Sequence, residues 1–220
     1  ALNETYQKFY DSYIKIAERL DLKVHPVLAD SGAIGGDYNH EFIVESPAGE
    51  GGAFLCDACD YAAGEERASA TFEDYKQDKE QKNIEEYWDE TVVNCEILAE
   101  KMGVPLQATT KTILFKADDI FVAAMVRGDY DINEAKLARH LGADNLELAS
   151  EKDIFKLTGA KVGFMGPVNL PEEIKVVADL TCENRTNFEA GGNKTGLHLY
   201  NLNYEKDFPT PEFADIRNVD

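Results

Sequence analysis

The first third of the chain combines one helical pattern with several strand-like runs. Over residues 3–20, apolar side chains recur at steps of three and four, which predicts an amphipathic helix with Asn3 as its N-cap. β-prone runs separated by glycine-rich loops predict an antiparallel sheet over residues 23–29, 41–45 and 52–56. Residues 64–90 then hold ten acidic and four basic side chains, which is typical of a linker or a solvated helix.

A second pattern begins at residue 91 and mixes helices with strands. An apolar stripe predicts a helix that ends at Gly103, because glycine commonly follows the last helical turn. The β-rich runs 111–117 and 120–126 predict a hairpin of central strands. Helices are expected to begin at Asp131 and Ser150, and further strands at 146–149, 174–180 and 197–202. This order of elements predicts an α/β or α+β domain with a mixed sheet.

Composition and charge limit the function. The chain has 220 residues and a net charge of −20, which argues against sequence-independent coating of DNA or RNA. The longest apolar run, near 121–126, is far shorter than the roughly 20 residues of a membrane-spanning helix, so no membrane partner is expected. The N-terminal residues lack a secretory pattern and the four cysteines are scattered, so we expect a cytoplasmic protein with reduced thiols.

Three ionisable residues interrupt apolar strands of the second half. Lys111 shares a strand face with Ile113 and Phe115, Asp179 breaks an apolar run, and His198 lies within the last predicted strand. For each residue alone, a strand-end side chain held by one salt bridge is the commoner explanation. The three together favour a functional site.

The glycine-containing loop from Gly163 to Pro167 is a further candidate. Its backbone can approach a ligand closely and offer N–H groups to a carbonyl or an oxyanion, with Gly166 adding freedom. The same residues are also typical of a tight turn.

Other motifs are weak or absent. Cys56 and Cys59 have the spacing of half a zinc site, but a structural site needs about four ligands, so reduced cysteines are the simpler interpretation. Asn193 begins one of three Asn-x-Ser/Thr triplets, which we interpret as chance. The sequence has no phosphate loop, no His-Glu-x-x-His and no nucleophile elbow, which disfavours the common ATPases, zincins and serine hydrolases.

Two groups of residues resemble bacterial-type prolyl-tRNA synthetases. The first group resembles the stretch after class II motif 2 of that enzyme, and it comprises residues 29–36, His40-Glu41-Phe42 and 56–63. Asn39 and Gly64 differ from the family's usual residues. The second group resembles the editing domain inserted in that enzyme, and it comprises Lys111-Thr112, 126–129 with Asn133-Glu134, 163–167 and 177–179. Residues 210–219 resemble the segment that returns to the catalytic domain.

The resemblance implies a domain order. Residues 1–63 would be part of a class II catalytic domain, 64–88 an acidic linker, 89–204 the inserted editing domain and 205–220 the return to the catalytic domain. The family's ATP-binding motifs would lie outside this chain, so it is expected not to make prolyl-adenylate. ATP and Mg would serve the parent synthetase, which is expected to be a homodimer.

The resemblance also implies an activity and roles for the candidate residues. The family's editing domain hydrolyses alanine mischarged onto tRNA(Pro), without a metal or other cofactor, because a proline pocket rejects a smaller amino acid only weakly. Lys111 would bind the 3′-terminal adenosine or its phosphate, and His198 would set the pocket size. Asp179 would position the ammonium group or the water, and the loop residues Gly163, Gly166 and Pro167 would hold the ester carbonyl.

Substrate contacts are implied for four more residues. Arg127 would join Lys111, Lys116 and Lys136 in a phosphate-facing patch, and Asn133 would contact the substrate in the same domain. His40 and Glu41 match the proline pocket of the catalytic domain. Two alternatives remain open: a tRNA- or amino-acid-binding fragment without turnover, and a small zinc module on the paired cysteines.

Overall fold

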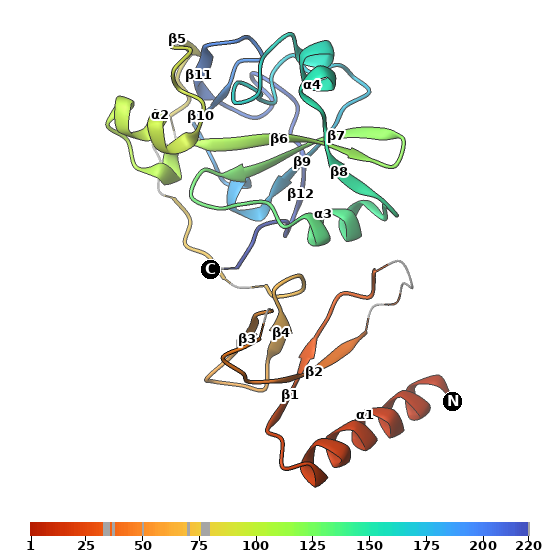
Figure 1. Cartoon of the computed structure of the whole chain (residues 1–220). Helices are drawn as coiled ribbons and strands as arrows, with labels where there is room; N and C mark the ends of the chain where they lie inside the picture. The colour runs from red at the N-terminus through yellow and green to blue at the C-terminus, as the bar shows by residue number, and fades with distance from the viewer. Residues whose placement is uncertain (33–35, 37, 50, 70, 76–79, 220) are drawn as a thin grey trace. The chain divides into compact units, whose positions relative to one another are not determined.

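The computed structural model describes residues 1–32, 36, 38–49, 51–69, 71–75 and 80–219 (Figure 1). Residues 33–35 of the family-like run 29–36 therefore lie outside the described residues. The chain forms two compact units, residues 1–70 with 219–220 (unit 1) and residues 71–218 (unit 2). Within the described ranges, no helix combines the length and the apolar character needed to cross a membrane.

Unit 1 contains one helix and a four-stranded sheet. Its elements are α1 (Leu2–Arg19), β1 (Val24–Leu28), β2 (His40–Val44), β3 (Ala53–Leu55) and β4 (Ala62–Gly64). The predicted helix and three predicted strands are confirmed to within one residue at each end, but the N-cap of the helix is Ala1, without a side-chain hydrogen bond, and Asn3 lies inside the helix. The fourth strand was not predicted, because Ala-Ala-Gly has low β-propensity. The sheet order is β2-β1-β4-β3, and β1 pairs parallel with β4, so the sheet is mixed and not wholly antiparallel.

The helix α1 packs its aromatic side chains on β2. The rings of Tyr10 and Tyr13 lie 5.2 and 5.1 Å from the ring of Phe42. Phe9, one helical turn before Tyr13, is 62% exposed.

Unit 2 is built on two sheets. The five-stranded sheet has the order β12-β9-β7-β6-β8, and the three-stranded sheet has the order β10-β11-β5. The strands are β5 (Glu85–Trp88), β6 (Thr110–Ala117), β7 (Ile120–Arg127), β8 (Leu146–Leu148), β9 (Lys175–Asp179), β10 (Phe188–Gly191), β11 (Leu197–Leu202) and β12 (Glu212–Ala214). The predicted hairpin is confirmed as β6 and β7, which pair antiparallel in the middle of the larger sheet.

Three helices of unit 2 begin at side-chain caps. They are α2 (Cys95–Met102), α3 (Glu134–Leu141) and α4 (Glu151–Thr158), with the short 3-10 turns η2 (Leu106–Ala108) and η3 (Leu180–Cys182) between the other elements. Ser150 caps α4 as predicted. The cap of α3 is Asn133 and not Asp131, because the Asn133 side chain accepts a hydrogen bond from Lys136 N at 3.1 Å. The predicted left-handed glycine after α2 is confirmed at Gly103.

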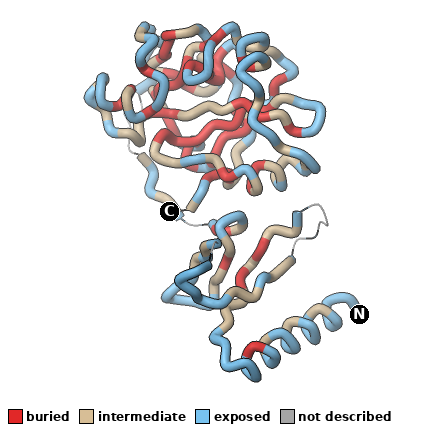
Figure 2. Tube along the Cα trace, in the orientation of Figure 1, coloured by how far each residue is buried: buried red, intermediate tan, exposed pale blue. Residues whose placement is uncertain are grey.

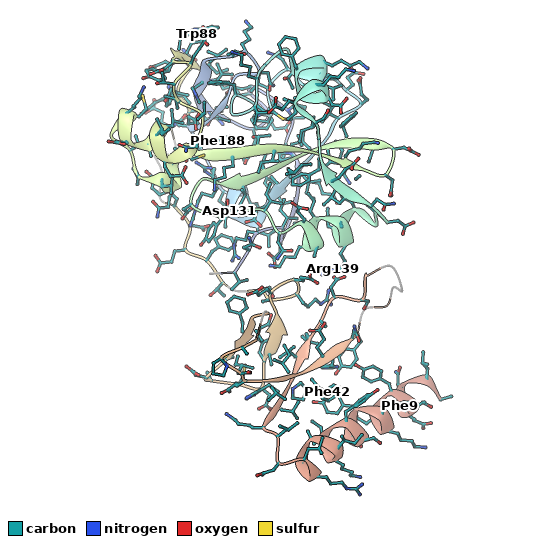
Figure 3. The ribbon with its side chains drawn as sticks, viewed as in Figure 1. Phe9, Phe42, Trp88, Asp131, Arg139 and Phe188 are labelled. Atoms are coloured by element: carbon teal, nitrogen blue, oxygen red, sulfur yellow. The ribbon has the colours of Figure 1, made fainter. Side chains whose placement is uncertain are left out.

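The larger sheet of unit 2 is covered on both faces. Leu137 of α3 packs with Phe115 on one face, and Ile154 of α4 packs with Leu114 on the other. Figure 1 shows α3 and α4 on opposite sides of this sheet, and Figure 2 shows its central strands as the most buried part of the unit. Phe188 of β10 lies inside a third cluster between the two sheets (Figure 3).

Two strands lie in segments where the sequence predicts none. β5 falls in the acidic stretch, and it pairs with β11 through its backbone while Tyr87 packs edge-on against Tyr200. β12 falls in the segment 205–220, and it pairs parallel with β9, with Ile216 fully buried behind it. Residues 205–218 therefore pack within unit 2.

Candidate active site

A pocket of about 260 Å³ opens in unit 2 beside β6. Its lining is largely apolar and comes from six places: the start of α2, residues 110–114 of β6, Ile154 of α4, the loop around Gly163, and β10 and β11. Among the sequence-predicted residues it brings together Lys111, Gly163 and His198, which lie far apart in the chain. A small apolar pocket with a few convergent polar groups is the usual form of a ligand site.

The pocket lies where β6 has an unpaired edge. β8 pairs only with residues 115–117 of β6, so the preceding residues have a strand partner on one side only. Because Gly128 N donates to Thr109 O, alternate residues from Thr110 onward direct their backbone groups away from β7. Thr112 is one of them, and its buried hydroxyl has no hydrogen-bond partner in the described part of the chain.

Glycines let the loop 163–167 approach the pocket wall. Gly163 has φ +95°, and a Cβ there would lie 2.8 Å from Val93 O. A Cβ at Gly166 would lie 1.8 Å from Gly191 O, so the loop touches β10 backbone to backbone. Gly163 lines the pocket, whereas Gly166 and Pro167 are buried behind it.

Asn193 holds this loop in place. Its side-chain amide donates to Gly166 O at 2.9 Å and to Val168 O at 2.7 Å, and its oxygen accepts from Gly166 N at 3.0 Å. The N–H of Gly166 is therefore already bonded, which corrects the expectation that it donates to a bound oxyanion. The sequence contains no signal for this role beyond a triplet interpreted as chance.

His198 is fixed at both ring nitrogens. Its Nε2 lies 3.1 Å from Val92 O and its Nδ1 lies 3.0 Å from Glu189 Oε1, and the ring is 4% exposed. A carbonyl oxygen only accepts hydrogen bonds, so Nε2 carries a hydrogen. The ring packs edge-on against Phe164 at 5.7 Å. His198 is thus a rigid wall of the pocket.

Glu189 is a pocket residue that the sequence did not reveal. It lies on β10 where every position is buried, so no alternation marks it out. Burial raises the pKa of Glu189, and the nearby His198 and Arg185 and the Thr110 backbone oppose that rise. Its Oε2 has no hydrogen-bond partner among the described residues.

Two further side chains define the chemistry of the pocket. Lys111 Nζ lies 2.6 Å from Asp131 Oδ1 and donates to Tyr130 O at 3.0 Å, so this ammonium has the salt bridge that is the commoner explanation for such a residue, and it also lines the pocket. Burial raises the pKa of the Cys95 thiol to about 11, which keeps it protonated and a poor nucleophile.

Asp179 does not line the pocket. It is fully buried, its Oδ1 accepts from Thr181 N and Oγ1 at 2.9 and 2.7 Å, and its Oδ2 accepts from Ile216 N at 2.9 Å. These bonds cap η3 and tie β9 to the segment after β12. The placement gives Asp179 a structural role, in place of the predicted contact with an ammonium group or a water.

The other predicted substrate contacts in unit 2 also serve the fold. Arg127 makes a two-point ion pair with Asp129 and donates to Glu73 O at 2.8 Å. Asn133 caps α3, and Lys136 is 1% exposed and paired with Asp215 at 3.0 Å. The expected phosphate-facing patch therefore loses Lys136, whose charge is internal, and Arg127 is not among the pocket residues.

His40 and Glu41 belong to unit 1. They alternate on β2, so His40 faces α1, where its Nδ1 lies 2.8 Å from the Tyr6 hydroxyl. Burial lowers the pKa of His40. Glu41 lines a separate open hollow beside β1 and β3. The structure thus places this predicted pair on opposite faces of the strand.

The cysteine pair does not gather metal ligands. Cys56 and Cys59 are exposed at the turn between β3 and β4, and Ala58 N donates to Cys56 Sγ at 3.4 Å. In the part of the chain that the structure describes, no three His, Cys, Asp or Glu side chains cluster as a metal site would require.

Curated relatives match almost the whole chain. The chain is 44% identical over 218 residues to a proline–tRNA ligase of Caldicellulosiruptor bescii and 43% identical over 221 residues to one of Geobacter metallireducens. These matches cover 99% and 100% of the chain but 38% of each relative, so the chain spans about two fifths of their length.

The fold and the domain family agree with these relatives. A structure of a proposed trans-editing enzyme for prolyl-tRNA synthetase superposes with a TM-score of 0.53 over 62% of this chain and 87% of its own, at 16% identity, which shows a shared fold. Residues 89–207 match the aminoacyl-tRNA editing domain family, and this range holds all the pocket residues. The chain belongs to the aminoacyl-tRNA editing domain family.

Proposed function

We propose that unit 2 hydrolyses the ester of alanine mischarged onto tRNA(Pro). Water adds to the ester carbonyl, the bond to the ribose oxygen breaks, and free alanine and tRNA(Pro) leave. The observation that carries this proposal is the small apolar pocket of about 260 Å³, rimmed by Lys111 and walled by His198, within the editing-family match.

The pocket suits selection by size. A methylene group is worth only about 0.8 kcal/mol of apolar transfer, so a site built for proline discriminates weakly against alanine. A second, smaller site accepts alanine and excludes proline, because the larger proline side chain overlaps its wall. Since both nitrogens of His198 are held, that wall does not yield easily to a proline ring.

Lys111 is the cation that we propose to contact the tRNA end. Its partner Asp131 has a side chain that is 73% exposed, so a phosphate of the 3′-terminal nucleotides can take over the ion pair at little cost. As a compact point charge, the ammonium suits such a contact. The net charge of −20 over the whole chain leaves most of the tRNA affinity to other parts of a longer enzyme.

The pocket side chains favour catalysis by positioning. His198 Nε2 donates to Val92 O and Cys95 is protonated, so neither side chain is available as a general base. Orientation of the ester and of a water, with stabilisation of the developing charge, supplies the rate enhancement. We propose that this requires no metal or other cofactor.

The chain as a whole is proposed to be part of a proline–tRNA ligase. The full-length coverage at 44% identity supports this. In that setting ATP and Mg serve the ligase reaction, and the parent enzyme is a cytoplasmic homodimer.

Turnover of alanyl-tRNA(Pro) tests the proposal. Excess labelled alanyl-tRNA(Pro) is incubated with the full chain, and we expect release of many alanine molecules per protein molecule. Binding of tRNA(Pro) without release above the spontaneous rate would instead support the non-catalytic binding fragment.

A further inference from the structure

Within the proposed function, we infer that Glu189 binds the α-ammonium group of the aminoacyl ester. The family resemblance implies that Asp179 makes this contact. The structure does not support that role, because the carboxylate of Asp179 is buried away from the pocket and already accepts three hydrogen bonds. Glu189 is the carboxyl group that lines the pocket.

The hydrogen bonds of His198 leave one oxygen of Glu189 unused. Val92 O takes the Nε2 hydrogen, so the 3.0 Å contact between Nδ1 and Glu189 Oε1 holds a single proton shared by the two groups. This contact engages Oε1 alone. Oε2 has no hydrogen-bond partner among the described residues, although the side chain is only 6% exposed.

A buried carboxyl oxygen without a donor is costly, and a ligand donor relieves that cost. The neighbouring cations of the protein form hydrogen bonds to other groups, although the charge of Arg185 still favours the ionised form of Glu189. Lys111 is bonded to Asp131 and Tyr130 O, and Arg185 donates to Thr110 Oγ1 at 2.6 Å and to Ala108 O at 2.7 Å. An α-ammonium group supplies three donors and a positive charge to the one carboxyl group of an otherwise largely apolar wall.

The shared proton adapts the site to its ligand. With a cation beside Oε2, the negative form of Glu189 is favoured and the shared proton moves toward His198 Nδ1. The size limit set by the imidazole is kept while the ammonium is bound, because Val92 O and Glu189 Oε1 still hold the ring. Recognition of charge and recognition of size are thereby joined in one residue pair.

A pair of matched esters tests this inference. Alanyl-tRNA(Pro) and lactyl-tRNA(Pro) differ only in an ammonium against a hydroxyl group, and each rate is divided by its own spontaneous hydrolysis rate. We expect the full wild-type chain to favour the alanyl ester. Glu189→Gln keeps a donor for His198 Nδ1 and removes the charge, so it should lower alanyl hydrolysis about 10- to 100-fold and leave lactyl hydrolysis nearly unchanged.

The control and the contrary results are distinct. Glu96→Gln removes an equal charge from an exposed position on α2 next to a pocket residue, and it should change neither rate. If Glu189→Gln lowers both rates equally, Glu189 only supports His198 and the inference is wrong. If the wild-type chain hydrolyses neither ester, the proposed function itself fails.

Discussion

Among single residues, substitution of Lys111 distinguishes a functional role from a structural role most clearly. Lys111→Ala should lower alanyl-tRNA(Pro) hydrolysis roughly 30- to 1,000-fold, since loss of one charge-assisted contact removes about 2–4 kcal/mol of transition-state stabilisation. Stability should change little, because its ion pair is with the exposed side chain of Asp131. Single-turnover rates and thermal melts on one preparation measure both effects.

The partner provides the matched control for this lysine. Asp131→Ala removes the same ion pair but keeps the ammonium, so it should retain most of the activity. Near-wild-type hydrolysis by folded Lys111→Ala, or an equal loss in both variants, would refute the functional role of the cation.

Pocket residues were predictable from the sequence where an ionisable side chain interrupts a long apolar pattern. Lys111 and His198 stand out for that reason, and both lie at the pocket. Asp179 stands out equally, but its position at a strand end let it cap η3, and a single sequence cannot distinguish a cap from a ligand contact. Glu189 and Asn193 gave no such signal, because their roles depend on partners distant in the chain.

At the scale of elements, the contact between the loop 163–167 and β10 decides whether the pocket forms. Gly166→Ala places a methyl group against Gly191 O, where neither backbone can yield, so we expect a loss of several kcal/mol of stability and of the activity. Gly159→Ala is the control, since it has φ +78° but open space around it and should cost only about 1 kcal/mol. Urea unfolding of both variants measures the difference, and equal costs would contradict this account.

The clamp on that loop gives a second prediction at this scale. Asn193→Ala removes three hydrogen bonds and leaves buried backbone groups unpaired, so it should destabilise the chain by about 2–4 kcal/mol. Asn193→Asp keeps the acceptor for Gly166 N but turns a buried carboxylate oxygen toward two carbonyl oxygens, so it should cost at least as much as Asn193→Ala. Chemical unfolding midpoints test this order, and a wild-type midpoint for Asn193→Ala would show that the clamp is dispensable.

Elements were predictable where a long periodic pattern specifies them. The hairpin of β6 and β7 and the capped helices α2 and α4 follow from local sequence. Short strands such as β5 and β12 were not predictable, because they owe their conformation to pairing with β11 and β9 and not to their own side chains. For the same reason the acidic stretch contains a strand at its end.

For the whole molecule, the reactivity of the four thiols distinguishes an editing domain with free cysteines from a zinc module. We expect Cys56 and Cys59 to react quickly with a thiol reagent in the native chain, because both are exposed. Cys95 and Cys182 should react only on unfolding, since burial raises the pKa of each thiol to about 11. One equivalent of tightly bound zinc with protection of the exposed pair would support the zinc module instead.

We propose that this chain is an editing module that removes alanine and spares proline. The most direct test of this proposal is hydrolysis of alanyl-tRNA(Pro) beside prolyl-tRNA(Pro) by the same preparation of the full chain. We expect rapid release of alanine and release of proline at the spontaneous rate, because the fixed ring of His198 limits the pocket. Equal hydrolysis of both esters, or preferential hydrolysis of the prolyl ester, would contradict this proposal.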